Sequence, residues 1–303
     1  MTLLRRRHLV LGLLTALVGC DAREESKAPI YTSAPAVVAG KPVYRLAVHP
    51  LHNPQTLHQL YTPLTDYLGR QLTEVHFEVE ASTSYADFQD KFTSRGPHLI
   101  LPNPYHALKA ADNGYEVIAE AGNSADFRGI FLLRKDSGIT SPLQLKGKTV
   151  AFPAPTALAA AMMPMVWLAN QGLKMPQDIQ SSFVGTHQSA ILNVYLGQAA
   201  AGVTWPSPWN DFQKSNPKEA AALHLVWQTP ELINNALMAR SDLPPHHIAR
   251  IRELLLGLHE HEEGQAILKG MMTPRFNPAD TARYRHVVGG FLKTYIAQVG
   301  PLP

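Results

Sequence analysis

Short apolar runs alternate with amphipathic segments along this sequence, and this alternation restricts the fold more than any other feature. Residues 43–49 (VYRLAVH), 75–81 (VHFEVEA) and 98–102 (HLILP) have the character of half-buried or buried strands. Between the first two runs, leucine and tyrosine recur at helical spacing from Leu57 to Leu68. This rhythm predicts a mainly parallel sheet with helices on both of its faces.

A second α/β unit comes after the first one. The remaining expected strands are 116–121, 127–135, 148–153, 182–185, 202–205, 223–228 and 234–240, and the remaining helices are 85–92, a helix from Tyr105, 156–171, 187–196, 248–268 and 281–298. We therefore expect an α/β protein of two lobes, in which the last helices return to the first lobe. Such an architecture binds its ligand in the cleft between the lobes.

The amino terminus predicts an export signal that ends in a lipid anchor. Three arginines at residues 5–7 precede an apolar run from Leu9 to Val18, which is about half of the ~20 residues needed to span a bilayer. Residues 1–19 are therefore interpreted as a signal peptide. The segment 17–20 (LVGC) resembles a bacterial lipobox, so we expect Cys20 to be lipidated. A free buried cysteine is the alternative.

Residues 20–42 are rich in Ala, Pro and Ser and lack periodicity, which predicts a flexible tether between the lipid and the folded domain. Asp21 resembles a signal for retention at the inner membrane, so we expect the protein on the periplasmic side of that membrane. The segment 6–10 (RRHLV) also loosely resembles a twin-arginine signal. The export route, general secretory or twin-arginine, stays open.

Charge and cysteine content exclude several classes of partner. The chain has 27 Lys and Arg against 24 Asp and Glu, and the three leader arginines account for the excess. The mature chain is formally neutral apart from its histidines and has no basic stripe, so we expect no nucleic-acid partner. A single cysteine excludes an internal disulfide and a cysteine-based zinc or iron–sulfur site.

Sequence signatures of catalysis are absent. The chain has no GxxxxGK[ST], no GxGxxG after the first strand, no GxSxG and no HExxH, so we expect no cofactor, no catalytic residue and no enzyme activity. His259 and His261 are two apart on an expected helix and so point to different faces. We interpret this pair, and the pair His246 and His247, as surface residues, and we expect no metal site.

Polar residues at strand ends and helix starts are the candidate ligand contacts. His49 and Asn103 each follow an expected strand, at the edge where α/β clefts open, although a loop or packing role is the alternative for both. Two helix starts, at residues 154–158 (APTAL) and 186–188 (THQ), offer backbone N–H groups and the positive end of a helix dipole. Such starts favour an anion.

Five segments, in this order and spacing, resemble one known family. They are 63–68 (PLTDYL), 102–105 (PNPY), 134–139 (RKDSGI), 145–152 (LKGKTVAF) and 185–190 (GTHQSA). Residues 43–291 look like the PhnD-type phosphate/phosphite/phosphonate-binding lipoproteins, which are solute-binding components of ABC transporters. The resemblance implies a type II periplasmic-binding-protein fold. We expect residues 43–135 plus 235–303 to form lobe 1 and residues 136–234 to form lobe 2.

The resemblance also implies a site for an oxyanion. By position in the family, Tyr105 would line the cleft from lobe 1. Thr156, with the backbone of Ala157 and Leu158, would seat the anion at a helix start, and His187 would hydrogen-bond it from the neighbouring helix.

Two departures from the family pattern affect the choice of ligand. Where phosphonate binders show Ser-Thr-Ser-Gly, residues 155–158 read PTAL, so two hydroxyl donors and one N–H are missing. Residues 203–209 (VTWPSPW) carry no carboxylate before Asp211, so an aminoalkylphosphonate is not expected. Trp205 and Trp209 suggest a partly apolar wall of the site or part of the core, and we include Trp205 among the ligand-binding residues.

These features predict a monomeric extracytoplasmic protein that captures a small oxyanion, such as phosphate, phosphite, phosphonate or arsenate, and delivers it to an ABC permease. Closure would occur about hinges near 135–142 and 229–234. A lipoprotein that senses the oxyanion and reports to a membrane histidine kinase is the alternative, and an envelope enzyme is a third hypothesis. The sequence does not identify the ligand.

Overall fold

The computed structural model describes residues 37, 38 and 40–303. The expected signal peptide 1–19, Cys20 and Asp21 lie outside these residues, as does most of the expected tether. The described residues belong to one compact unit. None of the helices among them has the length and apolar character needed to cross a membrane.

The first sheet is mixed, with strand order β1-β2-β4-β11-β5-β12 and with β3 paired to β2. Its strands are β1 (Val37–Val38), β2 (Lys41–Val48), β3 (His76–Ala81), β4 (Leu99–Leu101), β5 (Tyr115–Ala121), β11 (Asn235–Arg240) and β12 (Phe276–Asn277). β2 runs parallel to β3 and β4, as predicted. The sheet is less parallel than expected, because β11 returns late in the chain and pairs antiparallel with both β4 and β5.

The expected tether is shorter than predicted, because its last residues belong to the first sheet. Val37 and Val38 pair with Pro42 and Lys41 in an antiparallel ladder. The last residues of the predicted tether 20–42 are therefore part of the sheet.

The second sheet has strand order β10-β6-β9-β7-β8. Its strands are β6 (Ile130–Arg134), β7 (Thr149–Phe152), β8 (Gln180–Phe183), β9 (Ala201–Thr204) and β10 (Leu223–Gln228). Because β6 pairs with β9 and β10, the chain enters this sheet before residue 135, the expected lobe boundary. The connections between the sheets are residues 122–129 and 229–234. The predicted hinge at 135–142 lies inside the second lobe.

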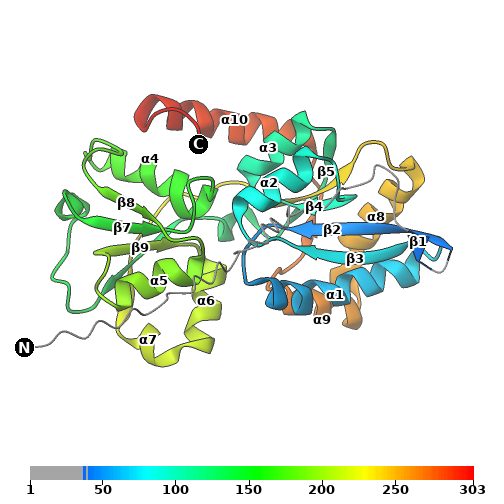
Figure 1. The fold of residues 1–303 in the computed structure, drawn as a ribbon, viewed down its shortest axis with the longest axis horizontal. Coiled ribbons are helices and arrows are strands. Elements are labelled where there is room, and N and C mark those ends of the chain that lie inside the picture. Colours follow the sequence, from blue (N-terminus) through cyan, green and yellow to red (C-terminus); the bar gives the residue numbers. More distant parts are fainter. Residues whose placement is uncertain (1–36, 39) are drawn as a thin grey trace, which may run out of the picture. The chain divides into compact units, whose positions relative to one another are not determined.

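Helices cover both faces of each sheet (Figure 1). They are α1 (Pro54–Gln71), α2 (Tyr85–Thr93), α3 (Pro104–Asp112), α4 (Met163–Asn170), α5 (His187–Tyr195), α6 (Pro206–Ser215), α7 (Pro217–Ala221), α8 (Pro245–Gly257), α9 (Glu262–Gly270) and α10 (Thr281–Gln298), with short helical turns η1 (Ser124–Asp126), η2 (Pro142–Leu145), η3 (Leu158–Met162) and η4 (Leu258–Glu260). The C-terminal helix α10 packs on α3 of the first lobe and on α4 of the second.

Two predicted helices differ from the observed ones. The expected helix 248–268 is interrupted, because α8 ends at Gly257 and His261 caps a new helix: its Nδ1 accepts the N–H of Gly264 at 3.0 Å. The expected helix 156–171 begins two residues late, at Leu158, and its first turn is a π-helix.

Strand register places the polar strand-end residues at one edge of each sheet. Val48 lies opposite both Ala81 and Leu101, so β2, β3 and β4 end at the same level. In the second sheet, Phe152 lies opposite Phe183. The segments that come after these strands therefore emerge on the same side of their sheet, and this edge faces the candidate ligand site.

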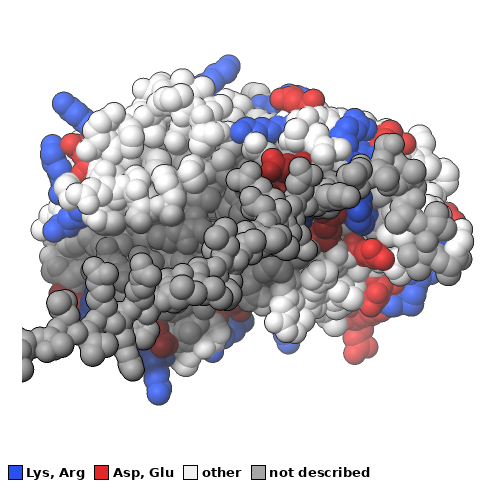
Figure 2. Space-filling view, in the orientation of Figure 1, with Lys and Arg blue, Asp and Glu red and all other residues white. Residues whose placement is uncertain are grey.

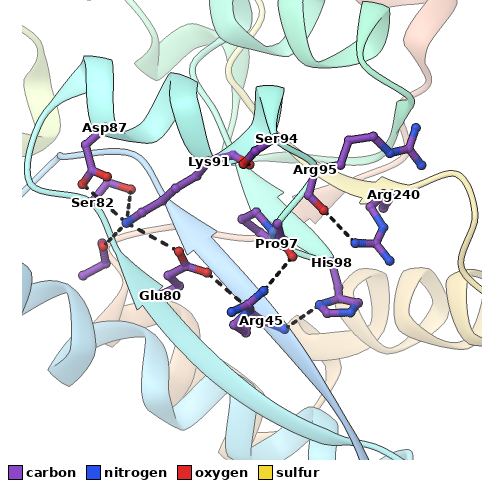
Figure 3. Close-up of polar contacts among 12 residues, drawn as sticks. Arg45, Glu80, Ser82, Asp87, Lys91, Ser94, Arg95, Pro97, His98 and Arg240 are labelled. Carbon is purple, nitrogen blue, oxygen red and sulfur yellow. Dashed lines mark hydrogen bonds and ion pairs between the residues drawn. The ribbon is translucent and has the colours of Figure 1, made fainter. Parts of the chain in front are cut away.

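A polar network fixes α2 against the first sheet (Figure 3). Lys91 of α2 donates to the carbonyl of Ala81 at 2.6 Å, and its Nζ lies 3.4 Å from Asp87 and 3.7 Å from Glu80. The side chain of Lys91 is only 9% exposed. The network continues to Arg45 of β2, whose Nε lies 3.5 Å from Glu80.

We expect Lys91→Met to lower the free energy of unfolding by about 3 kcal/mol, because it leaves the half-buried Glu80 without its lysine partner. Urea unfolding at neutral pH measures this change. Lys146→Met is the matched control: Lys146 pairs with Asp178 while its side chain is 68% exposed, so its loss costs less than about 1 kcal/mol. Equal effects of the two substitutions would contradict a structural role for the Lys91 network.

Candidate ligand-binding site

A small cavity of about 10 Å³ lies between the two sheets, which is room for the centre of about one water molecule. Its lining residues follow strand ends or begin helices on both lobes: His49, Leu51, Tyr85, Asn103, Phe127, Ala157, Leu158, Ala159, Ala160, His187, Trp205 and Asn235. No lysine, arginine or carboxylate is among these described residues. A ligand here is held by neutral groups.

Six of the eight predicted ligand residues line this cavity, namely His49, Asn103, Ala157, Leu158, His187 and Trp205. The other two, Tyr105 and Thr156, do not. Trp205 packs against Phe127 with ring centroids 5.6 Å apart, while Trp209 stacks on Phe212 in the core of the second lobe. Of the two tryptophans, only Trp205 forms part of the cavity wall.

Tyr105 points away from the cavity. Its ring is 1% exposed, its hydroxyl donates to the carbonyl of Pro303, and the Nζ of Lys109 lies over its face. Tyr85, at the start of α2, is the tyrosine that lines the cavity. Sequence reasoning missed it, although it shares the signal used for Asn103, since it opens a helix just after a strand.

Asn103 joins the two lobes across the cavity. Its Oδ1 accepts the N–H of His106 at 3.0 Å and so caps α3, while its Nδ2 donates to the carbonyl of Thr156 at 2.9 Å. Thr156 thus contributes its main chain to a bridge between the lobes. Both ends of the Asn103 amide serve the fold as well as the cavity wall.

Three backbone N–H groups open the helix on the second lobe. The N–H groups of Ala161 and Met162 both donate to the carbonyl of Ala157, at 2.7 and 3.3 Å. The preceding N–H groups, of residues 158–160, have no acceptor within the part of the chain that is described. These three residues are at most 5% exposed, and buried N–H groups normally find an acceptor. Unpaired N–H groups at a helix start are candidate donors to an anion.

Gly129, in the first connection between the sheets, allows this helix to approach. A Cβ at Gly129 would lie 2.4 Å from the carbonyl oxygen of Ala159. Gly129 and Thr229 hold the two connections side by side, because the N–H of each is hydrogen-bonded to an oxygen of the other at 2.9 Å. This helix start is therefore packed directly against the connection about which the lobes would move.

The ring of His187 contacts two hydroxyl groups. Its Nε2 lies 3.3 Å from the Tyr85 hydroxyl, and its Nδ1 lies 3.0 Å from the Thr204 hydroxyl. Burial lowers the pKa of His187 to about 3, so the ring is neutral, and burial raises the pKa of Tyr85. When Nε2 carries the hydrogen, His187 donates to Tyr85, and the Tyr85 proton is free to point at a ligand.

His49 offers the cavity a hydrogen-bond acceptor, its Nε2 atom. Its Nδ1 lies 2.6 Å from the carbonyl of Leu101, which can only accept, so Nδ1 carries the hydrogen. Burial lowers the pKa of His49 to about 4, which leaves Nε2 as a lone-pair acceptor at neutral pH.

Asn235, at the start of β11, is a lining residue that the sequence did not indicate. It is 4% exposed, and its Oδ1 has no hydrogen-bond partner among the described residues. Buried amide oxygens are usually satisfied, so Asn235 is a free polar contact on the cavity wall. The segment around it reads as an ordinary strand, and only its antiparallel return to the first sheet brings it to the site.

A second, larger cavity of about 550 Å³ adjoins the first one. Leu51, Trp205 and Asn235 line both cavities, which are therefore adjacent. The larger one extends between α6 of the second lobe and α9 of the first.

One group of potential metal ligands lies elsewhere among the described residues. Ligand atoms of Glu74, His246 and His247 come within 4.8 Å of one another. His247 is buried, contrary to our surface interpretation, because its Nδ1 is hydrogen-bonded to the Tyr44 hydroxyl at 2.7 Å and its Nε2 lies 3.4 Å from Glu74. These contacts account for its position. His259 and His261 are also not on one helix, since His259 lies in η4 and His261 is the N-cap of α9.

On the face shown in Figure 2, lysines and arginines are interspersed with acidic residues, and the visible surface has no continuous basic stripe.

The ring of His106 lies behind Tyr85 and forms no hydrogen bond with the described residues. Its ring stacks on Tyr85 with centroids 5.8 Å apart, it is fully buried, and both ring nitrogens lack a partner among the described residues. Burial lowers its pKa to about 3.

We expect His106→Phe to flatten the pH dependence of stability. The unfolded chain protonates His106 below about pH 6.5, whereas the folded protein does so only near pH 3, so its contribution to stability falls as pH falls through this window. Removing it should lower the slope by one proton, about 1.4 kcal/mol per pH unit, and leave stability at neutral pH equal or higher. Urea unfolding between about pH 4 and 7 measures both.

Exposed His224→Gln serves as the control and should retain the wild-type slope. An unchanged slope in His106→Phe would show that this ring is not held neutral by the fold.

Comparison with known proteins identifies the family. The model of a family described as "ABC transporter, phosphonate, periplasmic substrate-binding protein" matches residues 46–284. A probable ABC transporter phosphite binding protein, PhnD1 of Prochlorococcus marinus (strain MIT 9301), is 24% identical over an alignment of 184 residues that covers 56% of this chain and 62% of that protein. The match thus spans less than two thirds of the relative's length.

Solved structures show the same two-lobed α/β fold. A binding protein component of an ABC phosphonate transporter from Pseudomonas aeruginosa has a TM-score of 0.76 at 16% identity, over 87% of this chain and 91% of that chain. PhnD1 from Prochlorococcus marinus, in complex with methylphosphonate, has a TM-score of 0.75 at 21% identity, over 83% and 97%. With a family match over most of its length, the chain belongs to the periplasmic substrate-binding proteins of phosphonate ABC transporters.

Proposed function

We propose that this protein captures a small phosphorus oxyanion, a phosphonate, phosphite or phosphate, in the periplasm and delivers it to an ABC permease. One observation carries this proposal: three buried backbone N–H groups, at residues 158–160, open a helix on the wall of the cavity between the lobes. Hydrogen bonds from such donors to an anion are charge-assisted and strong. The family supports a transport protein and not an enzyme.

The donors around the cavity are neutral, and this suits release as well as binding. Tyr85 adds a hydroxyl from the first lobe, oriented by His187 and Thr204 of the second. An anion seated on the second lobe would thus draw Tyr85, and with it the first lobe, onto itself. Ligand binding and lobe closure are coupled in this way without a buried cation that would retain the ligand.

His49 supports selection of phosphorus over sulfur oxyanions. Its Nε2 lone pair can accept a hydrogen bond from a P–OH group, and phosphonate and phosphate monoanions carry one near neutral pH. Sulfate and sulfonates have no proton to donate there, so the same lone pair would face a bare oxygen. The lining has no carboxylate for an ammonium group, in keeping with our expectation against an aminoalkylphosphonate.

The family and the relatives named above are transporter components, which supports delivery to a permease over the alternative of a sensor for a histidine kinase.

We further propose that the mature protein is a monomer, lipidated at Cys20 and held by residues 21–36 at the periplasmic face of the inner membrane. The lipobox-like ending at residues 17–20 supports this anchor. Mass spectrometry of the membrane-extracted protein would detect a diacylglyceryl group on Cys20.

Isothermal titration calorimetry tests the function. We expect methylphosphonate, phosphite or phosphate to bind at least about tenfold more tightly than sulfate and methanesulfonate, because only the phosphorus oxyanions satisfy His49. Binding of a neutral or cationic solute with no heat from any oxyanion would overturn the proposal.

We expect Tyr85→Phe to weaken oxyanion binding at least about tenfold, because it removes a buried hydrogen bond to an anion, worth about 1.5–3 kcal/mol. Tyr105→Phe is the matched control: it removes the hydroxyl of a buried tyrosine that does not line the cavity, so affinity should stay unchanged. If Tyr85→Phe binds like wild type, the hydroxyl does not contact the anion.

A further inference from the structure

The larger cavity adjoins the proposed oxyanion site and is far larger than a simple oxyanion needs. Its volume, about 550 Å³, is typical of sites for organic molecules, whereas the inner cavity measures about 10 Å³. Leu51, Trp205 and Asn235 line both of them. A substituent on an oxyanion held at the inner cavity would therefore pass between these three residues into the larger one.

The junction is suited to an organic substituent. The faces of Leu51 and Trp205 are apolar, and the larger cavity continues this character with Leu268 and Met271. The unpartnered Oδ1 of the buried Asn235 lies at the same junction. Because an amide oxygen only accepts, a substituent that carries a donor such as a hydroxyl group would satisfy it at this junction.

Two lysines line the outer part of the larger cavity, one from each lobe. Lys214 lies in the last turn of α6 and Lys269 in the last turn of α9, and Figure 1 shows these helices on the same side of the two sheets. Neither lysine forms an ion pair within the described part of the chain, and one carboxylate, the exposed Asp126, lines the same cavity. His52 is also on the wall, 3.7 Å from Asp211. The lysines and the carboxylate that line this cavity therefore carry a net positive charge.

We propose that the ligand is an organic phosphonate or phosphate monoester whose substituent carries a second anionic group. The phosphoryl group sits at residues 158–160, the substituent crosses the junction at Trp205 and Asn235, and the distal anion is held by Lys214 and Lys269. This inference rests on the proposed function for its inner half. It replaces a bare oxyanion with a dianionic organic ligand as the preferred class.

Helix geometry offers a purely structural role for the same lysines. Cations in the last turn of a helix offset the negative end of its dipole, which is worth about half a kcal/mol at an exposed site. In that case their removal would change stability slightly and would leave the affinity for every ligand alike. The two roles therefore differ in whether the effect depends on the distal anion.

Titration calorimetry with a matched ligand series separates the roles. The probes are methylphosphonate, then alkylphosphonates of increasing length, and phosphonocarboxylates of the same lengths from phosphonoacetate to 6-phosphonohexanoate. We expect at least one phosphonocarboxylate to bind about tenfold more tightly than its alkyl counterpart, as two partly screened charge contacts would provide. The gain should shrink as salt is raised.

The double variant Lys214→Gln, Lys269→Gln should lose this gain while its affinity for methylphosphonate stays within about twofold of wild type. Lys218→Gln, on α7 and outside the cavity lining, is the matched control and should keep the gain. Equal binding of both series, or a gain that survives in the double variant, would overturn this inference alone. No binding of any member, methylphosphonate included, would overturn the proposed function as well.

Discussion

The amide of Asn103 is the contact on which the geometry of the site depends. One side chain caps α3 through its oxygen and bridges to the carbonyl of Thr156 through its nitrogen. The bridge brings the strand ends of the first lobe to within hydrogen-bonding reach of the helix start on the second. Residues that are distant in sequence, such as His49 and Ala159, then share one cavity wall. Opening the lobes must break this bond, so a ligand that supplies equivalent bonds shifts the balance between open and closed forms.

The two cavities differ in the charge of the side chains that line them. The inner one is lined by neutral, buried groups, because burial lowers the pKa of both His49 and His187 and leaves their rings uncharged. The outer one is larger and carries two exposed lysines that lack acidic partners among the described residues. Buried neutral donors give directional bonds to a phosphoryl group, and exposed lysines tolerate variation in the substituent that the phosphoryl group carries. In the proposed complex, one cleft would combine strict recognition of a head group with looser recognition of a substituent.

Much of the fold could be predicted locally. Asn53, Asn103 and Thr186 each cap a helix, and the capping pattern is visible in the sequence because a polar residue precedes a helical run. The predictions failed where pairing is non-local. β6 looks like the last strand of the first lobe but pairs with β9 and β10. We expected residues 235–240 to return to the first lobe, but not to pair antiparallel with β4 and β5. The choice between Tyr85 and Tyr105 failed for the same reason: both begin helices after strands, and only packing decides which ring faces the cavity.

The sequence by itself determined the alternation of strands and helices, the caps at the helix starts and the family, because these depend on residues close together in the chain or on their order. It also indicated six of the twelve residues that line the inner cavity, because strand ends and helix starts can be recognised from the order of residues in the chain. The tertiary structure alone decided that Tyr85 and not Tyr105 lines the cavity, that both nitrogens of His187 bind hydroxyl groups, and that Asn235 joins two cavities. Each of these depends on burial and on contacts between the lobes. Such contacts join residues that are far apart in the chain, and the order of the chain does not show which of these residues will meet.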